Sequence, residues 1–159
     1  MIENIWNIRI AAVEVYLSKI AGTEKQTAVL HGKLKQTEDG FVYLDVSNDV
    51  INGLFRLIPD EEAVQPPYRQ SKYNSVGAHI SVMKSDEIEE FEITKIKEIG
   101  DYFDFTIIGM SSVIPDWKGI KKLWMVEVDS PQLESLRRRY GLTPRLNGHH
   151  FHITVGVKR

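Results

Sequence analysis

Apolar and polar residues alternate near the end of the chain, and this period of two predicts a half-buried strand over residues 148–157. Apolar side chains occupy every second position from Phe151 to Val157, and His152 and Thr154 stand between them. Because residues i and i+2 of a strand point the same way, His152 and Thr154 are expected side by side, about 6–7 Å apart along the strand.

The same alternation occurs at residues 78–82, where His79 and Ser81 share one face of a predicted strand. Ala78, Ile80 and Val82 form its apolar face. The chain therefore holds two copies of one pattern, an apolar residue followed by His-x-Ser/Thr and a further apolar residue, and no other convincing repeat.

The remaining patterns predict an α+β fold with a largely antiparallel sheet, because hairpins dominate and helices are few. Helices are expected at residues 4–21, 47–57 and 131–140, with a single helical turn after Ser85. Hairpins are expected for strands 27–35 and 41–46 and for strands 91–99 and 102–110. A further strand, buried on both faces, is expected at 121–128, and long loops at 60–75 and 111–119.

Length and composition indicate a single domain spanning residues 1–159, soluble and cytoplasmic. The N-terminus lacks the pattern of a signal peptide, and no apolar run reaches the roughly 18–20 residues of a membrane span. The chain has no cysteine, which excludes disulfides and cysteine-based zinc sites. The net charge of −2 argues against a broad phosphate-binding surface. It is compatible with binding of a small phosphate ligand or of the end of a nucleic-acid strand.

Two His-x-Ser/Thr pairs that face each other can divide acid–base work on a phosphodiester. An imidazole titrates near pH 6.5, so one ring can accept a proton while the other donates one. The hydroxyls of Ser81 and Thr154 can donate hydrogen bonds to phosphate oxygens. This chemistry needs no metal and no cofactor. One such motif alone means little, whereas two copies on two strands favour a functional interpretation.

The two motifs, Ala78-His79-Ile80-Ser81-Val82 and Phe151-His152-Ile153-Thr154-Val155, resemble the paired signature of the 2H phosphoesterase superfamily. That superfamily includes RNA-ligase-associated and cyclic-phosphodiesterase enzymes. The Tyr-Gly-Leu-Thr-Pro segment and the Gly-His-His lead-in to the second motif are most similar to its Swiss-army-knife, RNA-repair-like branch.

The resemblance implies a bilobal domain with two pseudo-symmetric lobes, in which one motif strand from each lobe lines a central cleft. It implies that His79 and His152 are the catalytic pair and that Ser81 and Thr154 bind phosphate oxygens. It also implies a substrate that is a nucleotide or RNA end with a cyclic phosphate. No membrane and no protein partner is implied. Large RNA as an obligate substrate fits poorly with the charge, and the roles of the two histidines stay open.

Other residues carry weaker signals. Tyr68, Lys72 and Tyr73 precede the first motif and are candidates for stacking on a base and contacting phosphate, against the alternative of a solvated loop. The run Arg137–Arg139 on the predicted helix is interpreted as a solvated face.

Two alternatives use the same residues. His150 and His152 form a His-x-His pair on one strand face, which together with a third ligand would suit zinc in a metal-binding hydrolase or binding module. The second alternative is a catalytically inactive module that binds a nucleotide. RNA ends, small cyclic nucleotides, cyclic oligonucleotides and cyclic phosphates derived from ADP-ribose all remain possible ligands.

Overall fold

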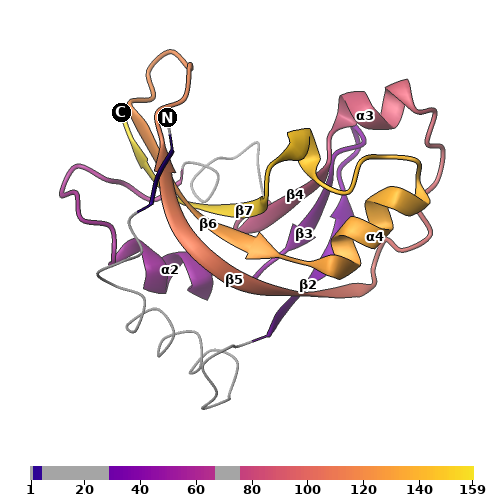
Figure 1. Cartoon of the computed structure of the whole chain (residues 1–159), viewed down its shortest axis with the longest axis horizontal. Coiled ribbons are helices and arrows are strands. Elements are labelled where there is room, and N and C mark those ends of the chain that lie inside the picture. Colours follow the sequence, from indigo (N-terminus) through magenta and orange to yellow (C-terminus); the bar gives the residue numbers. More distant parts are fainter. Residues whose placement is uncertain (1, 5–28, 67–75) are drawn as a thin grey trace.

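The computed structural model describes the chain at residues 2–4, 29–66 and 76–159 (Figure 1). Its strands are β1 (Ile2–Asn4), β2 (Leu30–Gln36), β3 (Val42–Asp45), β4 (His79–Met83), β5 (Tyr102–Val113), β6 (Lys122–Asp129) and β7 (Phe151–Lys158). Its helices are α2 (Asp49–Phe55), α3 (Ser85–Glu90), α4 (Pro131–Arg139) and the 3-10 helix η3 (Leu146–Gly148). The predicted α+β class is confirmed.

The strands form one sheet in the order β4-β3-β2-β5-β6-β7, with β1 also paired to β5, and every pairing is antiparallel. The long, curved strand β5 joins the two halves, because its first part pairs with β2 and its later part with β6 (Figure 1). The two motif strands, β4 and β7, stand at opposite ends of this order yet lie side by side, since the sheet curves back on itself.

Apolar side chains on one face of these strands form the core. Leu34, Leu44 and Ile80, from β2, β3 and β4, have no exposed surface. Helix α4 packs against β4 and β5, whereas α2 packs against β7. The helices therefore cover the apolar face, and the alternate residues of the motif strands point away from it.

Most of the other sequence predictions are confirmed with small shifts of their ends. Strands β2 and β3 form the first hairpin, with Gly40 at φ 100° in its turn. Helix α4 begins after Ser130, whose hydroxyl accepts a hydrogen bond from the backbone N–H of Leu133 at 3.2 Å. Helix α2, the short helix α3 and strands β6 and β7 also occur where expected. In β6, Leu123 and Trp124 are both buried, but Met125 is only partly so.

The second predicted hairpin is wrong, because residues 91–99 form no strand. Phe91 instead follows the end of α3, and its N–H donates to the carbonyl oxygen of Glu87 at 3.0 Å. The alternation at Phe91 and Ile93 resembles that of a strand. The start of β5, expected to pair with this segment, pairs instead with β2, and Leu30 lies opposite Phe105.

The loop predicted at 111–119 begins later than expected, since β5 continues to Val113. Ser111 and Ser112 gave this segment a polar appearance, yet both are buried between the neighbouring strands β1 and β6. Of the helix predicted at 4–21, Asn4 belongs to β1, and residues 5–21 lie outside the described residues. None of the helices in the described ranges is long and apolar enough to cross a membrane.

Candidate active site

The first motif lies on β4, which alternates as predicted. Ile80 and Val82 are fully buried, and His79 and Ser81 occupy the opposite, partly exposed face. The start of this strand is held by Asn48, whose Oδ1 accepts a hydrogen bond from the backbone N–H of Ala78 at 2.9 Å. Gly77 adopts φ +70°, and an added Cβ there would lie 2.9 Å from Asn48 Oδ1, so any other residue would be strained at this position.

A hydrogen bond of His79 to the backbone determines which nitrogen of its ring carries the proton. Nδ1 lies 2.8 Å from the carbonyl oxygen of Gly77. Because a carbonyl only accepts, Nδ1 carries the proton, and Nε2 of the neutral ring bears the lone pair. Burial lowers the pKa of His79 below its ordinary value, and the Gly77 carbonyl and the charge of Asp45 oppose this only in part.

The second motif lies on β7, where Phe151, Ile153 and Val155 are buried and His152 and Thr154 share the other face. Burial again lowers the pKa of His152, and a hydrogen bond to the backbone of His150 partly opposes it. Each motif histidine therefore bonds the backbone two residues before it. Repulsion from His79 lowers the pKa of His152 further. The strands that carry the two histidines, β4 and β7, pack against each other.

Each motif histidine faces a carboxylate on the neighbouring strand. Asp45 is paired with His79 in the β3–β4 ladder, and Glu127 is paired with His152 in the β6–β7 ladder. Both carboxylates favour the protonated form of the ring that they face. Neither carboxylate could be identified from the sequence, since each is only a polar position on an alternating strand, and the register that aligns them with the histidines is a long-range property.

Each carboxylate is in turn held by a polar neighbour. Asp45 Oδ2 forms an ion pair with Lys35 Nζ at 2.7 Å. Ser111 Oγ donates a hydrogen bond to Glu127 Oε1 at 3.3 Å. The two halves of the site thus repeat one arrangement: histidine, opposing carboxylate, and a donor behind the carboxylate.

Two aromatic rings flank His79. Phe41 and Tyr43 stack on each other with their centroids 5.6 Å apart. Both meet the imidazole edge to face, at centroid distances of 6.0 Å for Phe41 and 5.9 Å for Tyr43. Tyr43 is also paired with Ser81 across the ladder, so it stands on the same face as the whole first motif.

A cavity of about 570 Å³ opens beside the second motif. Its wall is rich in basic side chains, and Arg145 is oriented by an ion pair from its Nε to Glu134 Oε1 at 3.1 Å. The cavity is lined by Val113, Met125, Glu127, Arg145, Gly148, His149, His150 and His152. It therefore combines one motif histidine and its carboxylate with groups suited to an anion.

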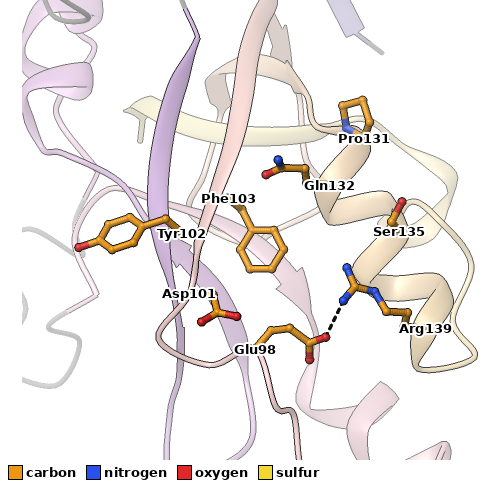
Figure 2. Close-up of a pocket in the computed structure, with 8 residues that line it drawn as sticks. All are labelled: Glu98, Asp101, Tyr102, Phe103, Pro131, Gln132, Ser135 and Arg139. Carbon is orange, nitrogen blue, oxygen red and sulfur yellow. Dashed lines mark hydrogen bonds and ion pairs between the residues drawn. The ribbon is translucent and has the colours of Figure 1, made fainter.

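A second cavity, of about 480 Å³, lies between the start of β5 and α4 (Figure 2). Figure 2 shows Arg139 reaching from α4 to Glu98, and Nη1 lies 2.8 Å from Oε2. None of the four motif residues lines this cavity, whereas His152 lines the other one. The first cavity is therefore the one that belongs with the motifs.

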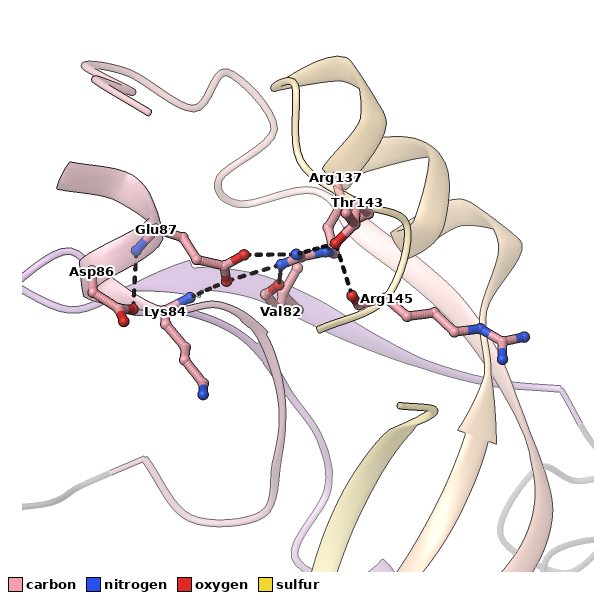
Figure 3. Close-up of polar contacts among 7 residues, drawn as sticks. All are labelled: Val82, Lys84, Asp86, Glu87, Arg137, Thr143 and Arg145. Carbon is pink, nitrogen blue, oxygen red and sulfur yellow. Dashed lines mark hydrogen bonds and ion pairs between the residues drawn. The ribbon is translucent and has the colours of Figure 1, made fainter. Parts of the chain in front are cut away.

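A buried arginine connects the first motif strand to the loop that leads into the second (Figure 3). Arg137 donates from Nη1 to the carbonyl oxygen of Val82 at 2.7 Å and from Nε to that of Thr143 at 2.6 Å. Its Nη2 lies 2.7 Å from Glu87 Oε2. The solvated face expected for this arginine run is confirmed for Arg138 and Arg139 but is wrong for Arg137, which is fully buried.

The remaining candidates fall in different places. Tyr68, Lys72 and Tyr73 lie outside the described residues, so their proposed substrate contacts stay predictions. His150 lines the same cavity as His152. In the described part of the chain, no three His, Asp or Glu side chains converge in a way that could hold a metal ion.

The fold, with one His-x-Ser/Thr motif on each of the neighbouring strands β4 and β7, is that expected of a phosphoesterase with paired histidines. Residues 42–159, nearly three quarters of the chain, match the family model described as "Swiss Army Knife, 2H phosphoesterase domain". The chain belongs to the 2H phosphoesterase superfamily, in its Swiss Army Knife branch. Neither a curated protein nor a solved structure matches it. Family membership supports a phosphoesterase activity on a phosphate-containing substrate.

Proposed function

We propose that the protein is a metal-independent phosphodiesterase that hydrolyses a 2′,3′-cyclic phosphate at an RNA end or in a small cyclic nucleotide or oligonucleotide. The observation that carries the proposal is the repeated surroundings of His79 and His152. Each ring bonds the backbone two residues earlier, faces a carboxylate, and has a hydroxyl residue two positions along its strand. Two equivalent acid–base groups suit a reaction that moves one proton on each side of a phosphorus atom.

In the proposed reaction, a water molecule attacks phosphorus and one histidine takes its proton. The bond from phosphorus to the ribose 2′ or 3′ oxygen breaks, and the other histidine protonates that oxygen. The product is a phosphate monoester with a free neighbouring hydroxyl group, and the proton balance is restored by exchange with solvent. Ser81 and Thr154 donate hydrogen bonds to the non-bridging oxygens throughout, where negative charge increases.

The charges around each ring favour one assignment of roles. Asp45 supports the protonated form of His79, whereas His152 is repelled by both His79 and His149. Glu127 favours the protonated form of His152 in the same way, but the repulsion from other histidines acts on His152, so we assign His79 as the acid. His152 is the ring that stays neutral, and it serves as the base.

A substrate screen tests the proposal. RNA oligonucleotides with a 2′,3′-cyclic phosphate end, cyclic mononucleotides, cyclic oligonucleotides and cyclic ADP-ribose phosphates are each incubated with the protein, with and without EDTA. Turnover of at least one compound that persists in EDTA is expected. Loss of turnover in EDTA, with recovery on adding zinc, would favour a metal hydrolase using His150 and His152. Binding without turnover would favour an inactive nucleotide-binding module.

A further inference from the structure

The solvent face of the sheet beside His79 carries aromatic and basic side chains in rows. His79, Asp45, Lys33 and Tyr102 are paired in succession across β4, β3, β2 and β5, so their side chains stand on one face. Three spacings between strands give this row a length of about 14 Å. It begins at the candidate catalytic histidine and ends at an exposed tyrosine.

The aromatic groups on this face are accessible to a ligand. Tyr102 is 65% exposed, which is unusual for so large a ring. The exposed His31 meets it edge to face, with their centroids 5.9 Å apart. Tyr43 and Phe41 form the other aromatic group, next to His79. The face therefore presents two aromatic groups, one at each end of the row.

Lysines lie between these aromatic groups. Lys33 and Lys35 are both exposed on β2, and the charge of Lys35 interacts with Asp45, Tyr43 and Tyr102. Asp104, opposite His31, offsets part of this positive charge. A surface with aromatic rings and few net charges binds mainly by stacking, with one or two contacts to phosphate.

We propose that this face binds the nucleotides that precede the cyclic phosphate in a short single-stranded RNA, which makes an RNA 3′ end, rather than a mononucleotide, the substrate class. The inference rests on the proposed function. The terminal nucleotide contacts Tyr43 and Phe41 beside His79, and a preceding base stacks on Tyr102. A row of about 14 Å is several times the ~3.4 Å that separates neighbouring bases in one strand, so it accommodates more than one nucleotide.

The test compares kcat/KM for a mononucleotide, a dinucleotide and a tetranucleotide, each ending in a 2′,3′-cyclic phosphate. The value is expected to rise with length, and Tyr102→Ala should reduce the ratio of tetranucleotide to mononucleotide by about five- to a hundredfold, the scale for one stacked base. Tyr102→Phe keeps the ring and should retain the ratio. Trp117→Ala removes an aromatic side chain of similar exposure from the loop between β5 and β6, and it should leave the ratio unchanged.

Equal kcat/KM at all lengths would overturn this inference while leaving the proposed function standing. If no compound is turned over, the proposed function fails, and the face is tested by binding alone. Fluorescence anisotropy with a labelled RNA tetranucleotide ending in a 3′-phosphate should then still show weaker binding for Tyr102→Ala than for Trp117→Ala. Identical affinities of the two variants would overturn the inference. Lys33 and Lys35 are the lysines that the described residues place in this row, so the slope of log K against log salt should not be steeper than about −1.5 if they make the phosphate contacts.

Discussion

Arg137 and Val82 are joined by a hydrogen bond of 2.7 Å from the guanidinium Nη1 to the carbonyl oxygen. Val82 follows Ser81 on β4, and the same guanidinium holds the Thr143 carbonyl in the loop before β7 (Figure 3). One buried side chain thus links the backbone next to the first motif with the approach to the second. We expect this link to help fix the relative position of the two motifs.

Replacing Arg137 with methionine should lower the free energy of unfolding by about 1–3 kcal/mol, since it removes the donor to the carbonyl oxygens of Val82 and Thr143 and the ion-pair partner of the partly exposed Glu87. Arg138→Met, on the exposed side of the same helix, should change it by less than about 0.5 kcal/mol. Urea unfolding followed by circular dichroism measures both. Equal effects of the two substitutions would contradict the anchoring role.

The same ion pair makes a prediction about acid stability. Burial raises the pKa of Glu87, but the hydrogen bonds from Arg137 and from the Lys84 backbone outweigh it, so the pKa lies below its ordinary value. A depressed carboxyl pKa contributes stability that is present above the unfolded pKa, about 4.3, and is lost as pH falls through the folded pKa. The difference in unfolding free energy between the native protein and Arg137→Met should therefore shrink below about pH 4.3. If this difference in unfolding free energy stays constant down to pH 3, the charge of Glu87 does not contribute to it.

Local patterns were sufficient to predict the two motif strands. Alternation identified β4 and β7, and turn and cap residues identified the first hairpin and the start of α4. These features depend on neighbours in the chain, which is why one sequence reveals them. The strand wrongly predicted at 91–99 shows where local patterns are insufficient. The apolar residues there belong to a loop, and Ile96 of this loop packs into the core.

Long-range features could not be predicted from the sequence. Arg137, Arg138 and Arg139 are chemically identical, and only the packing of α4 against β4 and β5 buries the first of them. Asn48 could be identified as a cap residue but not as the acceptor for Ala78, thirty positions away. Asp45 and Glu127 face the histidines because of strand register, which is set by the whole sheet.

Removing either motif histidine should abolish most turnover. His79→Ala and His152→Ala should each lower kcat by about a hundredfold or more, the scale of general acid–base catalysis. His150→Ala should have a much smaller effect, because the proposed reaction uses its backbone rather than its ring. Steady-state kinetics on the substrate found by the screen measures all three, with circular dichroism to confirm folding. An equal loss in all three variants would contradict this division of roles.

Asp45 should control the alkaline limb of the pH profile. The pKa values of both histidines lie below their ordinary value near 6.5, so the optimum of kcat/KM is expected on the acid side of neutrality. Asp45→Asn removes a charge that favours protonated His79, lowers the pKa of that acid further, and should move the alkaline limb to lower pH. Asp104→Asn, on the same face but opposite His31, should leave the profile in place. A shift of the acidic limb instead would show that His79 is the base.

Glu127 should control the acidic limb of the kcat/KM profile. Its charge favours protonated His152, so Glu127→Gln should lower the pKa of the proposed base and extend activity to lower pH. Asp129→Asn, two residues further along β6 and paired with Thr106, is the matched control and should not move the limb. The same kcat/KM profiles answer both questions. If Glu127→Gln moves only the alkaline limb, the roles of the two histidines must be exchanged.

The two hydroxyls provide a test that is independent of proton transfer. If Ser81 and Thr154 each donate one hydrogen bond to a charged phosphate, its removal should cost about 1.5–3 kcal/mol, which is roughly ten- to two-hundredfold in kcat/KM. Ser81→Ala and Thr154→Val should show this loss, and Thr154→Val also keeps the branched shape that suits β7. Ser81→Thr should be nearly silent, because the second motif already uses threonine at the equivalent place.

Melting temperatures should change little in all three variants, since both side chains are partly exposed on the face away from the core. A fully active Thr154→Val variant would mean that this hydroxyl does not bind the phosphate, and the equivalence of the two motifs would then end at the histidines.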